Sequence, residues 1–273
     1  MRKIKSILIT FGILTPILTL CSLTLVKPDD GFVRLFNGKN FDNWTLTLRN
    51  NDAEMAKKVF TIDKKGVIHV FKDFPEGFGS KTDLNATHGM MWSNKKYSKF
   101  IFKFEYKWGK TLLNNSHVYQ YDAGFYYHCK EPKIWPVGVE YQVRYNHIKN
   151  INHTGDFWAP GDLVRFDWTA DKDDKFAFIK DGGQPVPRKK GEHAASAQAK
   201  FNGLNGKWNT CEVIVMGSKY AIHKLNGKVV NYATNLTLEE GIIGLQSETG
   251  EIFYRNIMIK ELNTDIPAEE FLK

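Results

Sequence analysis

Residues Phe100–Trp108 read FIFKFEYKW, and this stretch decides the fold class. Aromatic side chains at every second position alternate with Ile101, Lys103, Glu105 and Lys107, so one face of the segment is apolar and the other is mostly charged. Successive side chains of a β-strand point to opposite faces of the sheet. The pattern therefore predicts a strand with one face in a hydrophobic core and the other mostly in solvent.

The same kind of signal continues on both sides of this stretch, from Gly31 onward. Short alternating runs are bounded by Gly, Asn, Asp and Pro, and hardly any segment has a helical period. Asn226-Gly227 lies between two such runs and favours the type I′ turn of a β-hairpin. The further strands that we expect are Trp44–Leu48, Val59–Ile62, Val67–Phe71, Met90–Ser93, Gly124–Cys129, Val139–Tyr145, Leu163–Trp168, Phe176–Ile179, Cys211–Met216, Tyr220–Leu225, Lys228–Tyr232, Ile242–Gln246 and Ile252–Leu262.

Around fourteen strands without crossover helices cannot form a parallel sheet. We therefore predict an all-β jelly-roll sandwich of two antiparallel sheets. The chain has 273 residues, 42% of them hydrophobic and 14% aromatic, which is enough to bury a large core. No domain boundary or internal repeat is visible, so residues 28–273 are expected to form a single domain. The long polar connection Asp181–Asn205 is predicted to be a functional loop or a mobile flap.

The first residues are typical of a targeting segment. Three basic residues, Arg2, Lys3 and Lys5, precede the uncharged and mostly apolar run Ile7–Leu20. We therefore assign residues 1–27 to a signal peptide or lipoprotein anchor and leave them out of the fold. The sequence predicts an exported protein.

How this terminus is processed is left open by the sequence. The uncharged run extends to Val26, and about 20 apolar residues can span a bilayer once. Leu18–Cys21 resembles a lipoprotein cleavage box, although the residue before the lipidated cysteine is usually small and here is Leu20. The alternatives are a lipid on Cys21, simple cleavage, or a retained anchor. The expected location is periplasmic, or attached to the outer membrane through the Cys21 lipid or the N-terminal segment.

Charge and cysteine content narrow the classes of partner. The formal charge of +8 falls once the three basic residues of the targeting segment are removed, and the other lysines are scattered among acids. An exported protein with this pattern is not expected to bind nucleic acid. Cys129 and Cys211 could pair in an oxidising compartment, but nothing brings them together, so we expect two separate buried thiols. Their spacing also lacks a metal-finger pattern.

The segment Val139–Tyr145, preceded by Trp135, is the most informative for function. Alternation places Glu140, Gln142 and Arg144 on one face of the strand. This face is either a solvated surface with a Glu140–Arg144 ion pair or part of a sugar site. Sugar sites need planar polar groups that form paired hydrogen bonds, beside aromatic rings that cover pyranose faces. We therefore treat Trp135, Glu140, Gln142 and Arg144 as candidates for such a site.

Two neighbouring segments add candidates. In the strand that begins near Asp122, Tyr126 and His128 would share one face, and His128 is either a packed core residue or a catalytic one. Asp156 follows a glycine and either caps its own loop or binds ligand. Trp158, two residues later, supplies an indole.

A third cluster lies near the C-terminus. Gln246 and Glu248 have the same parity, so they project together if the strand continues. Glu248 is then the natural second carboxylate, with an ordinary strand-end glutamate as the alternative. We expect Glu140, Gln142 and Glu248 to converge on one pocket, with Arg255 nearby and an aromatic ring such as Trp135 or Trp158 at the rim.

Seven short motifs in this order resemble the 3-keto-disaccharide hydrolases, a family first known as a domain of unknown function. They are GFVRLFNGK (31–39) with Trp44, Trp135-Pro136 with Glu140-Tyr141-Gln142, Gly155-Asp156, GKWNT (206–210), Asn226-Gly227-Lys228, GLQSE (244–248) and Tyr254-Arg255-Asn256-Ile257. The resemblance implies a concanavalin A-like lectin/glucanase fold whose concave sheet carries the site. It also implies relatives that cleave 3-keto glycosides.

An ordinary retaining glucanase of this fold would carry Glu-x-Asp-x-x-Glu on one strand. This string is absent, and Gln142 stands where a carboxylate would be wanted, so direct displacement is disfavoured. A 3-keto group acidifies the C2 proton, and one base can then drive loss of the glycosidic oxygen by elimination or overall hydrolysis. Glu140 or Glu248 is the expected base. Arg255, Gln142 or His128 would stabilise the enolate, or a divalent metal would do so; no other cofactor is expected.

Two other classes of function compete with this enzyme. A non-catalytic carbohydrate-binding module would use the same aromatic and amide groups, but would not need a carboxylate with a raised pKa. A structural lipoprotein would use neither. For the enzyme and for the binding module, the expected partner is an oligosaccharide or glycoside.

Overall fold

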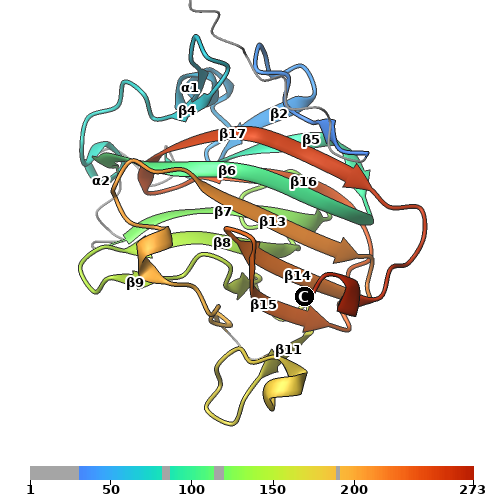
Figure 1. Ribbon diagram of the computed structural model, residues 1–273. Helices are drawn as coiled ribbons and strands as arrows, with labels where there is room; N and C mark the ends of the chain where they lie inside the picture. The colour runs from blue at the N-terminus through green and yellow to red at the C-terminus, as the bar shows by residue number, and fades with distance from the viewer. Residues whose placement is uncertain (1–30, 82–86, 114–119, 189–190) are drawn as a thin grey trace, which may run out of the picture.

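The computed structural model describes residues 31–81, 87–113, 120–188 and 191–273. The predicted targeting segment, residues 1–27 with Cys21, lies outside them. Two antiparallel sheets stack face to face, which confirms the predicted all-β sandwich (Figure 1). Within the described ranges, no helix is long and apolar enough to cross a membrane.

The larger sheet has ten strands, and the FIFKFEYKW stretch forms the middle of its longest member. The aromatic side chains Phe100, Phe102 and Phe104 have no exposed surface, as the alternation predicts. In spatial order the strands are β12 (Gln184–Pro187), β11 (Asp167–Ala170), β15 (Lys228–Thr234), β14 (Tyr220–Leu225), β13 (Asn209–Met216), β6 (Lys99–Leu112), β17 (Gly250–Glu261), β4 (Ile68–Val70) and β3 (Phe60–Ile62), with β1 (Val33–Arg34) on β17.

The smaller sheet has seven strands and carries the polar residues singled out above. Its inner face packs against the larger sheet, and the rings of Phe125 and Phe102 stack across the interface with centroids 4.1 Å apart. Side chains of opposite parity therefore point away from the core. The strands are β10 (Phe157–Trp158), β8 (Val139–Asn146), β7 (Gln120–Cys129), β16 (Gly241–Ser247), β5 (Gly89–Tyr97) and β2 (Trp44–Leu48), with β9 (Ile151–Asn152) on β8.

Short helices and turns connect these strands. Helix α1 (Ala53–Val59) begins after Asp52, whose side chain accepts a hydrogen bond from the backbone of Met55. Helix α2 (Phe78–Lys81) is a single turn. The predicted hairpin is confirmed, because Asn226 and Gly227 have φ of 49° and 78°, both in the left-handed region that a type I′ turn requires.

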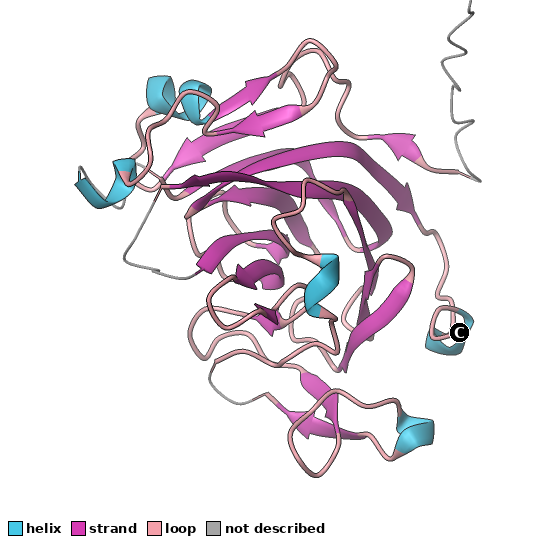
Figure 2. Ribbon diagram, turned by 60° about the vertical axis from the view of Figure 1, so that its left-hand side comes forward, coloured by secondary structure: helices cyan, strands magenta, loops and turns pink. Residues whose placement is uncertain are grey.

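Two strand predictions between β10 and β13 are wrong. Phe176–Ile179 is not a strand: Phe176 makes an isolated bridge to Ala170, and Ile179 begins a 3₁₀ turn. The strand expected at Leu163–Trp168 begins only at Asp167. The Arg188 guanidinium takes three carbonyl oxygens of the preceding segment, those of Ala159, Gly161 and Val164, as acceptors, so this backbone wraps around a side chain. Figure 2 shows the β11–β12 hairpin extending from the sandwich.

The remaining cysteines behave as expected. Cys129 and Cys211 are both free and buried. Each lies in a different hydrophobic cluster of the protein. The structure therefore confirms two separate thiols.

Candidate active site

The polar residues of the smaller sheet surround a cavity on the face that points away from the core. Strands β7 and β8 pair in a register that places Asp122 opposite Arg144, and Tyr126 opposite Glu140. Glu248 approaches from the turn that follows β16. The cavity has a volume of about 160 Å³ and is lined by Asp122, Tyr126, Trp135, Glu140, Gln142, Arg144, Trp158, Glu192 and Glu248.

Two glutamates of the cavity, Glu140 and Glu248, are each held by a glutamine two residues away in sequence. The amide nitrogen of Gln142 lies 2.6 Å from Oε1 of Glu140, when the amide is oriented to satisfy both of its ends. Nε2 of Gln246 donates to Oε2 of Glu248 at 2.7 Å. Gln246 therefore supports Glu248 and does not line the cavity itself. The alternation of side chains along a strand had placed Glu140 with Gln142, and Glu248 with Gln246, as the structure does.

The position of Glu140 depends on a glycine in the neighbouring strand. A Cβ atom built on Gly124 would lie 2.0 Å from Oε1 of Glu140. The Glu140 carboxyl therefore occupies space that any side chain at position 124 would fill. Gly124 lies between Asp122 and Tyr126 on the cavity face of β7.

Asp122 belongs to the cavity, although no sequence pattern had singled it out. Its backbone N–H donates to the Thr249 hydroxyl at 2.7 Å, which fixes β7 beside the Glu248 turn. Its side chain is buried, with Oδ2 4.0 Å from Nη1 of Arg144. Oδ1 has no hydrogen-bond partner among the described residues. Its parity with Tyr126 was the sequence signal that could have identified it.

A loop residue completes the cavity. Glu192 contacts both terminal nitrogens of Arg144 through its two carboxylate oxygens. The same loop is fixed by Asp156, whose Oδ1 accepts from the backbone of Ala195 at 2.6 Å. Part of the long polar connection therefore lines the cavity. No sequence pattern had identified Glu192.

Asp156 lies beside the cavity and does not line it. Its Oδ2 is 3.0 Å from Nδ1 of His153, which is also 3.7 Å from Glu192. In the described part of the chain, these three residues form a group with spacing suited to a divalent cation. However, Glu192 already has the Arg144 guanidinium as its counter-charge. Asp156 thus contacts its own loop through His153 and the later loop through Ala195.

Burial dominates the electrostatics of the cavity. It raises the pKa of Glu140 and of Glu248 well above the usual range, and the nearby charge of Asp122 adds to the effect. Burial also raises the pKa of Asp122 to about 7, although Arg144 opposes this change. Burial therefore favours the protonated form of these carboxyl groups, as in groups that take part in proton transfer.

Aromatic rings form the rim, as expected. Trp158 pairs with Glu140 across β10 and β8, and its ring meets Tyr126 edge to face at 6.3 Å. The Trp135 ring has the Arg49 guanidinium 4.5 Å from its centroid. It also meets the ring of His88. Rings in this arrangement can cover the apolar face of a sugar.

His128 lies outside the cavity, so the prediction that it shares a face with Tyr126 is wrong. Its φ of 53° breaks the alternation at the end of β7. Its two ring nitrogens lie 3.0 Å from the carbonyl oxygens of Leu238 and Ser98. Burial lowers its pKa to about 4, so the ring is a neutral packing group at physiological pH.

Arg255 is also far from the predicted place, because β17 belongs to the other sheet. Its Nε donates to Oε2 of Glu105 at 2.6 Å. Its guanidinium lies 4.0 Å from the centroid of the Trp208 ring. Arg144 is therefore the arginine of the cavity.

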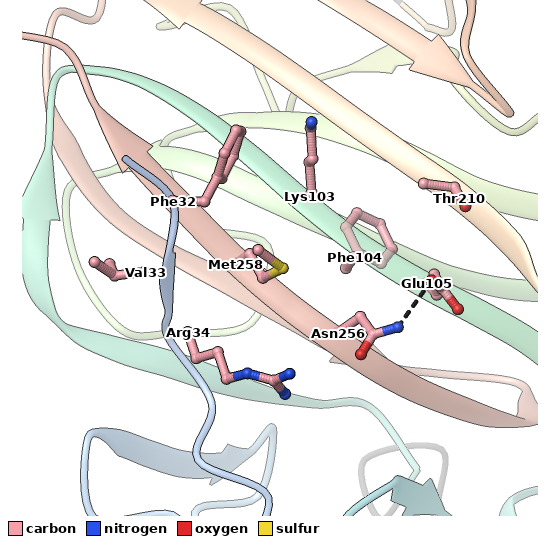
Figure 3. Close-up of a pocket in the computed structure, with 9 residues that line it drawn as sticks. All are labelled: Phe32, Val33, Arg34, Lys103, Phe104, Glu105, Thr210, Asn256 and Met258. Atoms are coloured by element: carbon pink, nitrogen blue, oxygen red, sulfur yellow. Dashed lines mark hydrogen bonds between the residues drawn. The ribbon is translucent and has the colours of Figure 1, made fainter. Parts of the chain in front are cut away.

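A larger cavity of about 510 Å³ lies on the outer face of the ten-stranded sheet (Figure 3). Its carboxylate, Glu105, accepts from Asn256 at 2.9 Å and from Arg255. Lys103 pairs with Glu212 at 3.1 Å. No two carboxyl groups converge there, so the smaller cavity is the candidate active site.

Comparison with known proteins agrees with the motifs. Residues 31–260 match the model of the 3-keto-alpha-glucoside-1,2-lyase-like domain. The chain belongs to this family. The resemblance inferred from the seven motifs is confirmed, and the family supports a glycoside-acting enzyme. No curated protein sequence matches the chain.

Solved structures share the fold of this family member. A candidate glycosyl hydrolase from Parabacteroides distasonis is 20% identical, with a TM-score of 0.50 over 85% of this chain and 99% of that one. A second structure from that organism is 19% identical, with a TM-score of 0.49 over 85% and 94% of the two chains. A β-glucanase from Bacillus licheniformis is 11% identical, with a TM-score of 0.47 over 86% and 100%.

Proposed function

We propose that this protein cleaves the glycosidic bond of 3-keto glycosides by removing the C2 proton and expelling the glycosidic oxygen. The observation that carries the proposal is the group of three buried carboxyls, Asp122, Glu140 and Glu248, around one small cavity. The 3-keto group makes the C2 proton acidic. The reaction then needs one base, one donor to the enolate oxygen and one acid for the leaving oxygen.

Direct displacement at the anomeric carbon fits this cavity less well. A retaining glycosidase needs an ionised carboxylate that is free to attack. Here Glu140 and Glu248 both accept hydrogen bonds from glutamine amides, and burial raises the pKa of both. Groups of this kind are suited to holding and moving protons.

The cation that would stabilise the enolate is Arg144. It replaces Arg255 and His128, both of which lie elsewhere in the structure. Gln142, two residues away on the same strand, donates its amide N–H groups to Glu140 and to the carbonyl oxygen of Ala123, so it holds Glu140 in place. Preorganised donors at the position where negative charge develops make a large contribution to catalysis.

The size of the cavity supports a small substrate. Its volume of about 160 Å³ is below the roughly 300–1,000 Å³ of sites that hold drug-sized ligands. We propose that it takes a single keto-sugar ring, while Trp135 and Trp158 contact the attached group at the rim. The leaving group would then project toward solvent.

The test is incubation of the purified protein with a panel of glycosides and their 3-keto forms, with detection of products by mass. We expect cleavage of 3-keto glycosides alone, and the product mass separates elimination from hydrolysis. Glu140→Gln should lower kcat/KM by more than a hundredfold, and the exposed-site control Glu131→Gln should not. Binding of a glycan without any product from the wild-type protein would contradict the proposal and favour a carbohydrate-binding module.

A further inference from the structure

The charges of the cavity are unequal in number. Among the described residues that line it, Arg144 is the one cation, and four carboxyl groups surround it. Glu192 already contacts both terminal nitrogens of Arg144. Glu192 itself is exposed, but Asp122, Glu140 and Glu248 are buried. A low-dielectric site whose one guanidinium is already paired does not hold three ionised carboxylates, because uncompensated buried charges are costly.

Asp122 is the buried carboxyl best placed to carry a negative charge. Its Oδ2 lies 4.0 Å from Nη1 of Arg144, directly across the β7–β8 pair. Asp122 lines the cavity, and its buried Oδ1 has no hydrogen-bond partner among the described residues, so this oxygen is available to accept a proton. No described amide holds it in the way that Gln142 holds Glu140. An unpartnered oxygen in a buried cavity is costly unless it serves a ligand.

Glu140, in contrast, is the carboxyl whose surroundings favour the protonated form. Its side chain is 3% exposed and folds over Gly124, and Oε1 lies 2.6 Å from the amide nitrogen of Gln142. It has no ion pair among the described residues, because the guanidinium opposite Asp122 is bound by Glu192. The Asp122 charge across the strand pair further favours the protonated form of Glu140.

We propose that Asp122 is the catalytic base that takes the C2 proton, and that Glu140 enters the reaction protonated as the acid. This inference rests on the proposed function and names the roles within that site. It also reverses the prediction from sequence, in which Glu140 or Glu248 was the base. Asp122 had not been identified at all.

The step balances without any oxidant or further reactant. The C2–H bond breaks and its proton passes to Oδ1 of Asp122, while the electron pair forms the C1–C2 double bond. The C1–O1 bond breaks, and O1 takes the proton of Glu140. The products are a 2-hydroxy-3-keto glycal and the free alcohol. Proton return from Asp122 to Glu140 restores the resting state.

The charged and titratable groups that face Asp122 come from several elements. Arg144 and Glu140 lie on β8, Glu248 follows β16, and His153 and Glu192 come from the loops. Burial, moderated by Arg144, raises the pKa of Asp122 to about 7. The base is ionised above this pH, so kcat/KM should rise as pH increases through about 7.

The test uses hydrogen–deuterium exchange at C2 of a 3-keto C-glycoside, in which carbon replaces the glycosidic oxygen and no leaving group exists. Wild-type protein should exchange this proton in D₂O. Asp122→Asn should exchange more than a hundredfold more slowly. Glu140→Gln should stay within tenfold of the wild type, although it no longer cleaves 3-keto O-glycosides. Asp167→Asn, on the other sheet, is the matched control.

Each other result decides against the inference. Exchange by Asp122→Asn within tenfold of wild type would overturn it, as would equal losses in Asp122→Asn and Glu140→Gln. If wild-type protein cleaves 3-keto glycosides but the roles are reversed, only this inference fails. If wild-type protein neither cleaves nor exchanges, the proposed function fails. Carboxyl ¹³C NMR of wild-type protein tests the roles without variants, since Asp122 should ionise at lower pH than Glu140.

Discussion

The outer faces of the two sheets carry the same kinds of charged residue in different arrangements. On the ten-stranded sheet Glu251 and Glu105 each have a basic partner: Glu251 lies 2.6 Å from Nε2 of His69, and Glu105 lies 2.6 Å from Nε of Arg255. Burial would raise the pKa of Glu251, but hydrogen bonds from His69 and from two backbone N–H groups lower it to about 2. Glu251 is therefore ionised under all physiological conditions.

On the seven-stranded sheet three buried acids share a cavity that one arginine lines. Asp122, Glu140 and Glu248 are almost fully buried around Arg144, which Glu192 already binds. Burial therefore raises the pKa of all three carboxyls. The ratio of carboxyl groups to cations, and not the presence of charged residues, separates a reactive surface from a structural one. Perturbed groups that cluster in a cavity are typical of catalytic sites.

The largest effect is expected where the packing of the acid cluster can be broken without removing any carboxyl. In Gly124→Ala the new Cβ would collide with Oε1 of Glu140 at 2.0 Å, so this carboxyl must move. Displacement of a catalytic group by about 1 Å can cost roughly a hundredfold in rate. We expect kcat/KM on a 3-keto glycoside to fall by that factor or more.

The matched control for this glycine lies in open space. At Gly203 the nearest atom to an added Cβ is 3.9 Å away, so Gly203→Ala should leave kcat/KM unchanged. Circular dichroism should show that both variants keep the sheet content. Full activity of Gly124→Ala would contradict the assignment of Glu140 to the reacting centre.

A smaller effect should appear in stability, with opposite signs on the two sheets. The pKa of Glu248 is raised in the folded protein, so stability is lost as pH rises above the unfolded pKa of about 4.5. Glu248→Gln removes this penalty. The free energy of unfolding should increase by about 1–3 kcal/mol at pH 8 and be unchanged near pH 4.

The comparison variant is Glu251→Gln on the ten-stranded sheet. The folded pKa of Glu251 is about 2, so its contribution is present above pH 4.5 and is lost as pH falls through 2. Its removal should lower the free energy of unfolding by about 1–2 kcal/mol at pH 7. Urea titrations at pH 4, 6 and 8 measure both. Destabilisation by Glu248→Gln at pH 8 would show that the two faces are not different in kind.

The fold was largely predictable because alternation is a local signal. The longest strand, β6, has aromatic residues at every second position in its middle. The hairpin turn is predictable from the Asn226-Gly227 dipeptide, because both residues readily adopt positive φ. The elements that were missed are too short to show a period. Strands β1, β9 and β10 have two residues each, and α1 has seven.

Of the site, the sequence could predict only which side chains lie on the same face of one strand. Parity placed Glu140, Gln142 and Arg144 on one face, and the structure brings them to one cavity. Parity does not indicate which sheet a strand joins. Strand β17 belongs to the ten-stranded sheet, so Arg255 lies outside the cavity. Parity also fails where a residue adopts a left-handed conformation, as His128 does. Loop residues such as Glu192 have no period at all.

The smallest effect is expected for Arg255→Ala. This variant tests whether the outer face of the ten-stranded sheet has any part in the reaction. Arg255 is 39% exposed, pairs with Glu105 and lies over the Trp208 ring, so it belongs to the structural face. Exposed ion pairs contribute about 0–1 kcal/mol, and exposed cation–π contacts add a similar amount. We therefore expect kcat/KM to stay within twofold of wild type and the unfolding free energy to fall by about 1 kcal/mol or less.

The contrasting variant is Arg144→Ala, which removes the cation of the cavity. It leaves the buried Asp122 without its nearest cation and removes the partner of Glu192, so activity should be lost together with the rise of kcat/KM through about pH 7. Steady-state kinetics and urea unfolding of the two arginine variants, measured side by side, give the comparison. A large loss of activity in Arg255→Ala would mean that the ten-stranded sheet also contributes to the reaction, because no contact of Arg255 in the structure reaches the acid cavity.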